Sequence, residues 1–278
     1  MTVIVHRDVA ARGVRLRVTE EGDGPRIVLL HGLFVDHRTW DGVRPRLRDA
    51  FRVIAPDLPG FGQSEIPPPT RFPYGIDAFA EAVTDLYAGL EIGRAALVGH
   101  GLGGAVALTV AARHPELVSH LVLIDAHAYN DATRVESRIA RAPLLGSLVF
   151  KQLVGRALFR AYCRTRLLSP DTRVDPALLD TFYDAFNSPP ARGSALAVLQ
   201  SALDTRPIIA CTARVQSPTL VVWGRFDAIY PASLGQRLAR EIRGAGLELI
   251  DAAHLSPVER PDLIADLIAR FVSGERAS

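Results

Sequence analysis

Short runs of consecutive apolar residues recur along the chain, and each is followed closely by a glycine, a proline or an aspartate. Runs of this kind are typical of strands buried on both faces, as in a parallel sheet. An earlier segment, residues 14–19, instead alternates apolar and polar residues as a half-buried strand does. The buried strands predicted in this way are residues 27–30, 52–55, 95–98, 120–124, 219–223 and 247–250.

Between these runs lie longer segments in which apolar residues recur every three or four positions. This spacing places the apolar side chains on one face of a helix. The helices predicted in this way are residues 76–90, 105–113, 231–243 and 257–272. Strands that alternate with helices favour the α/β class, with a mostly parallel, doubly wound sheet that helices cover on both faces.

A long segment without a strand pattern interrupts this alternation between residues 127 and 217. Apolar residues recur there at helical spacing around 144–168 and 178–186. Because connections in α/β units usually take only about 2–6 residues, a segment of this length predicts a separate helical cap. We therefore expect an α/β core made of residues 1–126 and 218–278, and a cap made of residues 127–217.

Glycines and side chains capable of acid–base chemistry directly follow several predicted strands. The segments are 31–34 (HGLF), 57–64 (DLPGFGQS), 99–103 (GHGLG), 223–227 (WGRFD) and 251–254 (DAAH). Ligands of open α/β sheets bind at the carboxyl ends of the strands, so these segments predict one shared site. Taken singly, each leaves a structural alternative open, such as a simple turn or a surface aspartate.

The content and order of these segments resemble the α/β-hydrolase family, in particular its capped meta-cleavage-product hydrolases and esterases. That family carries a serine in a G-x-S-x-G elbow between a strand and a helix, followed along the chain by an acid and a histidine. The resemblance covers nearly the whole chain outside the cap. It implies that the cap enters between strands six and seven of the family order and that residues 57–64 form a mainly structural loop.

The segment 99–103 departs from the family pattern at one position, because Gly101 stands where the family carries its serine. A glycine has no hydroxyl group, so an acyl-enzyme cannot form on it. The resemblance implies that Asp227 is the acid and His254 the histidine of the site. It also implies that the backbone N–H groups of Leu33 and Leu102 form an oxyanion hole.

Three hypotheses about function follow from the missing serine. The first is an enzyme in which His254, oriented by Asp227, acts as general acid or base on a small, largely apolar carbonyl substrate. Lyase, cyclase, decarboxylase and direct water-attack chemistry are all open to such a site. The second is a serine ester or carbon–carbon hydrolase inactivated by replacement of the serine. The third is a protein that binds a small ligand without catalysis. His100 is interpreted as the packing neighbour of the elbow rather than a catalytic group.

Composition and charge remove other classes of function. The formal net charge of +2 over 278 residues gives no basis for expecting nucleic acid or a membrane surface as partner. The two cysteines, Cys163 and Cys211, lack the spacing of a metal site. We expect no cofactor and no metal. Because no segment approaches the roughly 20 apolar residues of a transmembrane helix and residues 1–12 do not read as a secretory signal, we expect a cytoplasmic protein. A homodimer is left open.

The predicted cap is rich in basic and aromatic side chains, and each group has two interpretations. The basic residues either form a solvated helical face or direct one or two guanidinium groups to a substrate carboxylate. The aromatic residues either line an apolar pocket or form the core of the cap. The basic set is Arg134, Arg138, Arg141, Lys151, Arg156, Arg160, Arg164 and Arg166, and the aromatic set is Phe150, Phe159, Tyr162, Phe182, Tyr183 and Phe186.

Overall fold

The computed structural model describes residues 3–129 and 155–274, and its centre is an eight-stranded sheet with the order β1-β2-β4-β3-β5-β6-β7-β8. Strands β3 to β8 run parallel to one another. Strand β2 pairs antiparallel with β4, and β1 pairs antiparallel with β2. The mostly parallel α/β sheet predicted from the sequence is therefore confirmed. The strands are β1 (Val5–Ala11), β2 (Val14–Glu21), β3 (Arg26–Leu30), β4 (Arg52–Pro56), β5 (Ala95–His100), β6 (Val118–Ile124), β7 (Thr219–Gly224) and β8 (Gly246–Ile250).

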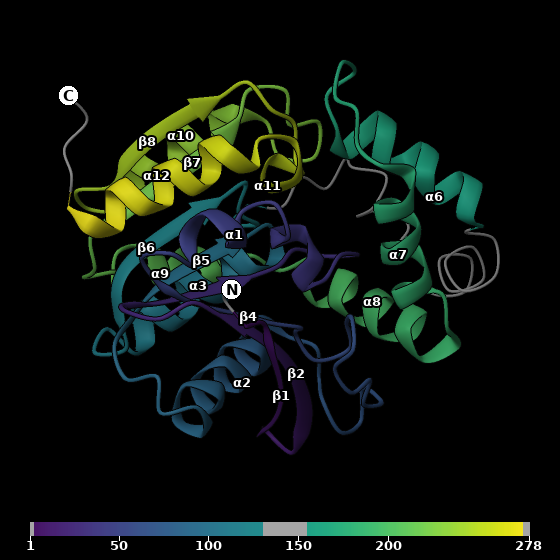
Figure 1. Ribbon diagram of the computed structural model, residues 1–278, viewed down its shortest axis with the longest axis horizontal. Coiled ribbons are helices and arrows are strands. Elements are labelled where there is room, and N and C mark those ends of the chain that lie inside the picture. The colour runs from purple at the N-terminus through teal and green to yellow at the C-terminus, as the bar shows by residue number, and fades with distance from the viewer. Residues whose placement is uncertain (1–2, 130–154, 275–278) are drawn as a thin grey trace.

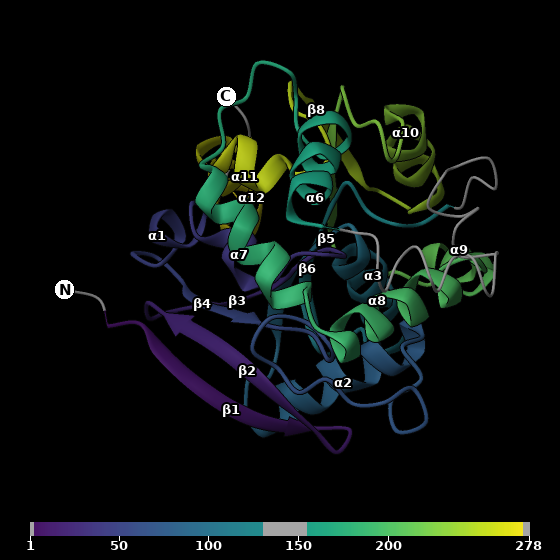
Figure 2. The ribbon, with the colours of Figure 1, turned by 90° about the vertical axis from the view of Figure 1, so that its right-hand side faces the viewer.

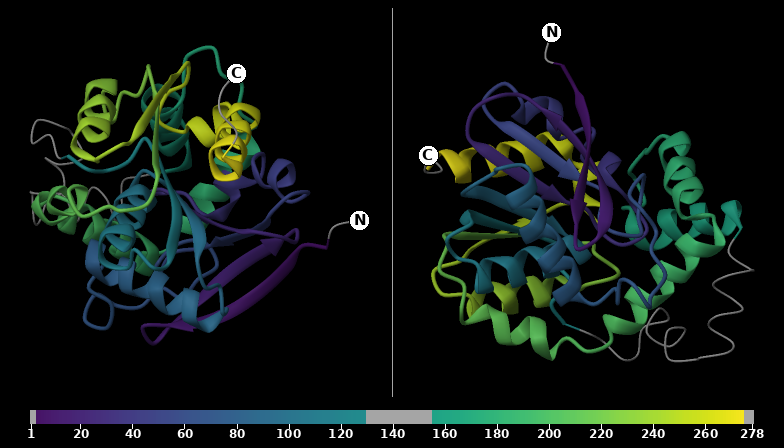
Figure 3. Two further views of the ribbon diagram at one scale, coloured as in Figure 1. Left: turned by 90° about the vertical axis from the view of Figure 1, so that its left-hand side faces the viewer. Right: turned by 90° about the horizontal axis from the view of Figure 1, so that it is seen from below.

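The first strand, β1, is absent from the strands that the sequence predicts. It forms an antiparallel hairpin with β2 at the edge of the sheet, where Figure 3 shows the pair. Of its residues only Val9 and Ala11 are buried. An edge strand needs few buried side chains, so its hydrophobic pattern is weak, and pairing with β2 supplies what the local sequence lacks.

Helices cover both faces of the sheet, because alternate residues of each strand point to opposite faces. In β3, for example, Val28 and Leu30 enter one apolar core, and Ile27 and Leu29 enter the other. The first core is closed by α2 (Ile76–Gly89), α3 (Leu102–Arg113) and α10 (Ala232–Glu241), and the second by α1 (Arg44–Leu47) and α12 (Pro261–Ser273). Figure 1 shows the sheet between these helices.

Two predicted helices differ from the observed ones. Helix α3 begins at Leu102 rather than at residue 105, because the chain enters it directly from the turn after β5. The predicted closing helix 257–272 is wrong as a single element. It is divided into α11 (Ser256–Glu259) and α12, with Arg260 between them at φ −133° and ψ 53°, outside the helical region. Pro261 starts α12 at a position where a missing N–H costs nothing.

The segment between β6 and β7 carries helices and, over its described residues 155–217, no strand. These helices are α6 (Arg156–Tyr162), the π-helical turn η3 (Cys163–Leu167), α7 (Pro176–Phe186), α8 (Pro189–Ser201) and α9 (Arg206–Thr212). Figure 1 shows α6, α7 and α8 on one side of the sheet, and Figure 2 shows them in front of it. The boundaries of the cap at residues 127 and 217 stay a prediction.

The parallel strands β3, β5, β6, β7 and β8 end at the same edge of the sheet. Residues that are far apart in the sequence therefore meet at this edge, and the loops after these strands build the site described below. Among the described helices, none combines the length and the apolar character needed to cross a membrane.

Candidate active site

A hydrogen-bonded histidine and aspartate lie at the ends of β7 and β8. The Nδ1 atom of His254 lies 2.9 Å from Oδ2 of Asp227. The other carboxylate oxygen, Oδ1, accepts the backbone N–H groups of Ile229 and Tyr230 at 2.6 and 2.8 Å. A carboxylate only accepts hydrogen bonds, so Nδ1 of His254 carries the proton and Nε2 has the lone pair of a general base.

Gly101 lies in the tight turn between β5 and α3, with φ of +53° and ψ of −114°. A residue other than glycine is strained at such a positive φ. A Cβ atom built on Gly101 would lie 3.5 Å from Nε2 of His254 and 3.6 Å from Cα of Gly32, which is ordinary contact distance. The turn thus directs position 101 at the histidine and has room there for a side chain.

The backbone N–H groups of Leu33 and Leu102 are available as donors beside this turn. Within the part of the chain that the structure describes, neither amide donates to a protein acceptor. Leu102 is the first residue of α3, so its N–H points out of the positive end of the helix dipole. Both leucines line the pocket that contains Gly101 and His254. Their function as an oxyanion hole stays a prediction.

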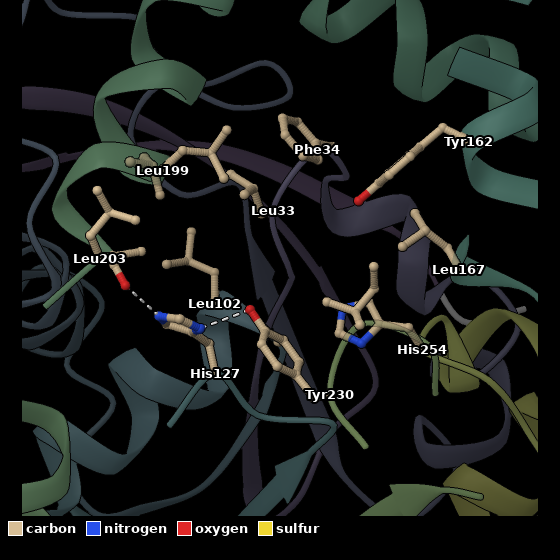
Figure 4. A pocket seen from close by; sticks show the side chains of 14 residues that line it. Leu33, Phe34, Leu102, His127, Tyr162, Leu167, Leu199, Leu203, Tyr230 and His254 are labelled. Atoms are coloured by element: carbon tan, nitrogen blue, oxygen red, sulfur yellow. Dashed lines mark hydrogen bonds between the residues drawn. The ribbon is translucent and has the colours of Figure 1, made fainter. Parts of the chain in front are cut away.

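The pocket above Gly101 is small and mostly apolar, with a volume of about 80 Å³. An engineered apolar cavity of about 150 Å³ binds benzene, so this pocket suits a group of only a few carbon atoms. Its apolar wall includes Leu33, Phe34, Leu102, Leu167, Leu199 and Leu203. Four polar side chains also face it, and Figure 4 shows them as His127, Tyr162, Tyr230 and His254.

Two of these polar residues, His127 and Tyr230, were not singled out from the sequence. Nδ1 of His127 lies 2.7 Å from the Tyr230 hydroxyl, and Nε2 lies 3.1 Å from the carbonyl oxygen of Ala202. Each residue follows a parallel strand by only a few positions, His127 after β6 and Tyr230 after β7. The rule that places functional residues at strand ends could therefore have identified both.

A second buried carboxyl group, Asp125, lies beneath the His254–Asp227 pair. It follows β6 with a φ of +45°, and it is fully buried. Its Oδ1 accepts the N–H of Gly224 at 2.7 Å, and its Oδ2 accepts the hydroxyl of Ser256 at 2.6 Å. Burial and the nearby charge of Asp227 raise the pKa of Asp125 well above its usual value. Asp125 thus joins the loop that carries Asp227 to the loop that carries His254.

His100 supports the histidine loop from the elbow side. Its Nε2 lies 2.7 Å from the backbone carbonyl of His254 and donates a hydrogen bond to it. Burial, together with the positive charge that His254 can carry, lowers the pKa of His100 to about 3. His100 therefore stays neutral at physiological pH and holds His254 in place rather than transferring protons.

Residues 57–64 form a closed hydrogen-bonded loop away from the pocket. Asp57 accepts hydrogen bonds from His37, through both the backbone N–H and Nδ1, and from the N–H of Gln63, each at 2.8 Å. Asp36, His37 and Asp57 are close enough together to hold a metal ion. However, Asp36 already binds the Arg38 guanidinium, with its Oδ1 2.9 Å from Nε. All three side chains thus already have hydrogen-bond partners within the protein, so this cluster does not need an ion.

The basic residues of the cap that the structure describes do not reach the pocket. Arg156 binds the carboxylate of Asp184 at 2.6 Å, and Arg160 binds Asp180 at 2.6 Å. Of the residues described, no arginine lines the pocket. The interpretation that one of these guanidinium groups holds a substrate carboxylate is therefore wrong for Arg156, Arg160, Arg164 and Arg166. The other basic residues of the set, Arg134, Arg138, Arg141 and Lys151, lie outside the described residues, as does Phe150.

The aromatic residues of the cap divide between its core and the pocket. Phe159 packs against Tyr183 and Phe186, with ring centroids 5.7 and 6.0 Å apart. Phe182 is buried in the same apolar core. Tyr162 alone of the described aromatic set lines the pocket above Gly101. The interpretation as cap core thus fits most of the aromatic residues, and the interpretation as pocket wall fits Tyr162.

Comparison with known proteins agrees with this architecture. The profile of the alpha/beta hydrolase fold family matches residues 25–261. The chain belongs to this family.

Relatives and solved structures with assigned activities cover almost the whole chain. It is 28% identical to a 2-hydroxymuconate semialdehyde hydrolase of Pseudomonas sp. CF600, over 97% of this chain and 94% of the relative. It is 31% identical to a pimeloyl-[acyl-carrier protein] methyl ester esterase of Neisseria meningitidis, over 90% and 94%. The crystal structure of an enol-lactonase from Burkholderia xenovorans matches with a TM-score of 0.83 and 26% identity, over 96% and 100%.

Proposed function

We propose that this member of the alpha/beta hydrolase fold family is an enzyme that acts on a small, largely apolar carbonyl compound without forming a covalent intermediate. His254 is the general base and acid, and Asp227 orients it. The observation that carries the proposal is the retained geometry around Gly101. The Nδ1 proton of His254 is held by Asp227, and its Nε2 faces the pocket beside an atom position that a glycine leaves open.

The chemistry that these groups support is proton transfer next to a carbonyl group. Nε2 of His254 takes a proton from the carbon beside the carbonyl, and the electron pair moves onto the carbonyl oxygen. The N–H groups of Leu33 and Leu102 stabilise the resulting enolate, and the imidazolium of His254 is stabilised by Asp227. Returning the proton to a different atom of the enolate gives isomerisation. Bond cleavage results if the enolate expels a leaving group from the next carbon, which departs with the bonding electrons and takes the proton from His254. The same base could instead activate a water molecule for attack on the carbonyl carbon.

A second candidate, a serine hydrolase that has lost its nucleophile, is favoured by two observations. A side chain at position 101 would have room and would point at His254. Two of the relatives with assigned names are a hydrolase and a methyl ester esterase. On this hypothesis the protein as it stands has lost the covalent step and keeps only the residual catalysis of the oxyanion hole and of binding.

The exchange of carbon-bound protons for deuterium tests the proposal. Small ketones such as butanone are incubated with the protein in D2O, and loss of the proton signals beside the carbonyl is followed by NMR. We expect exchange above the buffer rate, reduced roughly 100-fold or more in His254→Ala and strongly in Asp227→Asn, because a general base contributes roughly 10²–10⁴-fold. His114→Ala, which removes a partly exposed histidine at the end of α3, is the matched control and should exchange at the original rate.

The same proteins separate the competing hypotheses. One outcome is that the original protein neither exchanges protons nor hydrolyses p-nitrophenyl esters, whereas Gly101→Ser gives a burst of p-nitrophenol. The protein is then the inactivated hydrolase. A protein that binds ketones with equal affinity in its original and His254→Ala forms, and turns over none of them, is a binding protein. Either result contradicts the proposed function.

A further inference from the structure

The pocket contains a second pair of polar side chains, His127 and Tyr230, that the proposed reaction does not use. Figure 4 shows Tyr230 between His127 and His254, with its hydroxyl directed at His127. The ring of Tyr230 lies 5.4 Å from that of His127 and 5.3 Å from that of His254. Besides His254 and the Tyr162 hydroxyl, the mostly apolar pocket of about 80 Å³ thus has a polar group at the His127–Tyr230 pair.

The hydrogen bonds of His127 determine which atom of the pair holds each proton. The carbonyl oxygen of Ala202 can only accept, so Nε2 of His127 donates to it at 3.1 Å. In a neutral imidazole the other nitrogen, Nδ1, then has a lone pair and no proton. Nδ1 therefore accepts the hydroxyl proton of Tyr230 at 2.7 Å. As a result the oxygen of Tyr230 meets a ligand as an acceptor rather than as a donor.

Backbone hydrogen bonds connect both residues to the catalytic elements. The N–H of His127 donates to the carbonyl of Gly101 at 2.9 Å. The N–H of Tyr230 donates to Asp227 at 2.8 Å, and the Tyr230 carbonyl accepts the indole N–H of Trp223 at 2.8 Å. The pair is thus held in a fixed position relative to both the elbow and the acid, as a substrate-orienting group must be.

We propose that the Tyr230 hydroxyl oxygen, with its proton held by His127, recognises a hydroxyl group of the substrate. The substrate class is then a small carbonyl compound with a hydroxyl on the carbon next to the carbonyl. The backbone supports this short spacing, because the N–H of His127 bonds the carbonyl of Gly101, the residue directly before Leu102. The proposal depends on the proposed function in one respect, that the carbonyl oxygen binds between Leu33 and Leu102.

Binding of two ketones of equal size tests the proposal without requiring turnover. Hydroxyacetone and butanone each have five non-hydrogen atoms and differ only in a hydroxyl in place of a methyl group. Their dissociation constants are measured by NMR titration of the ¹⁵N-labelled protein, and the Leu102 amide signal reports on the carbonyl. We expect hydroxyacetone to bind roughly three- to tenfold more tightly, because a net hydrogen bond contributes that much.

Tyr230→Phe keeps the ring and removes the oxygen, so it should remove the roughly three- to tenfold preference for hydroxyacetone. His127→Phe removes the acceptor of the Tyr230 hydroxyl proton but leaves the Tyr230 oxygen in place, so it should lower the preference less than Tyr230→Phe does. A thermal unfolding curve for each variant verifies that it is folded. The ¹⁵N shifts of the imidazole of His127 should show a protonated Nε2 and an unprotonated Nδ1 in the unaltered protein.

The proposal is overturned if the preference survives in Tyr230→Phe, if the unaltered protein does not prefer hydroxyacetone, or if Nδ1 of His127 carries the proton. His254→Ala should still bind hydroxyacetone more tightly than butanone, because His254 is not part of the Tyr230 subsite. A failure of the proposed catalysis, seen in the proton-exchange experiment, is therefore distinct from a failure of this proposal. If both ketones bind and the Leu102 amide does not respond, the site assigned to the carbonyl is wrong, whereas the ratio of affinities still tests the subsite at Tyr230.

Discussion

At the scale of single residues, the site depends on where each proton is held. Asp227 fixes the proton of His254 on Nδ1, and the carbonyl of Ala202 fixes the proton of His127 on Nε2. The two histidines thus present opposite nitrogens to their surroundings. His254 turns Nε2 toward Gly101, and His127 turns Nδ1 toward Tyr230. A carboxylate beside one ring and a backbone carbonyl beside the other thus favour opposite tautomers of the two histidines.

Gly101→Ser should lower the free energy of unfolding by about 1–3 kcal/mol. The reason is the φ of +53° at this position, because any residue with a Cβ atom is strained in that conformation by about this amount. The side chain itself fits, because its nearest neighbour is 3.5 Å away. Urea denaturation of both proteins gives the difference, and Gly193→Ser, in the middle of α8 with open space around it, is the control. Equal stability of the original protein and Gly101→Ser would show that the elbow is not held at a positive φ.

Asp125→Asn should change how stability depends on pH. Because the pKa of Asp125 is raised in the folded state, folding takes up a proton above pH ~4, and stability falls as the pH rises toward the folded pKa. Asparagine has nearly the same shape and does not titrate, so the stability of the variant lacks this pH-dependent contribution. Urea denaturation between pH 4 and pH 8 measures the free energy of unfolding of both proteins. Relative to the original protein, that of the variant should increase with rising pH by up to about 1.4 kcal/mol per pH unit. A constant difference across this range would show that Asp125 is charged in the folded protein.

At the scale of elements, the elbow works because β5 and α3 approach β3 very closely. The N–H of Gly103, in the first turn of α3, donates to the carbonyl of His31 at 3.1 Å. A Cβ atom on Gly103 would lie 2.4 Å from the carbonyl oxygen of Leu30, at the end of β3. The helix can begin directly above the strand only because this position has no side chain. The same contact places the Leu102 N–H beside the loop that contains Leu33.

Gly103→Ala should therefore destabilise the protein by about 2 kcal/mol or more, because backbone atoms rather than a flexible side chain must move. It should also reduce catalysis, since the start of α3 and the Leu102 amide would shift away from Leu33. Gly193→Ala, in α8 with open space around it, should instead be neutral or stabilising by up to about 1 kcal/mol. Thermal and urea unfolding, together with proton exchange on butanone, measure both effects. An unchanged Gly103→Ala variant would contradict the close approach.

At the scale of the whole molecule, the fold brings distant parts of the chain to one edge of the sheet. His127 and Tyr230 are 103 positions apart in the sequence, and Ser256 and Asp125 are 131 apart. The described helices between β6 and β7 close the pocket from above through Tyr162, Leu167 and the residues of α8. The residues at the sheet edge and the helical residues that cover them therefore come from separate parts of the chain.

Much of this arrangement was predictable from local patterns. The buried strands have continuous apolar runs because both of their faces are covered, and α2 and α10 follow the helical spacing closely. The weak edge strand β1 and the break before Pro261 depend on neighbours in space, so the spacing of apolar residues missed them. The cap arginines show the same limit. A basic residue in a sequence does not reveal whether Asp180, Asp184 or a ligand will be its partner.

The sequence by itself determined the α/β class, the order of the motifs, the glycine at the elbow, and the aspartate and histidine that follow it. Those features are encoded over a few neighbouring residues by periodicity and by the geometry of tight turns. Only the tertiary structure decided that His127 binds Tyr230, that Asp125 joins two loops, and that none of the described arginines lines the pocket. Hydrogen-bond partners and protonation states depend on distances of a few ångströms between segments far apart in the chain, and no local pattern encodes such distances.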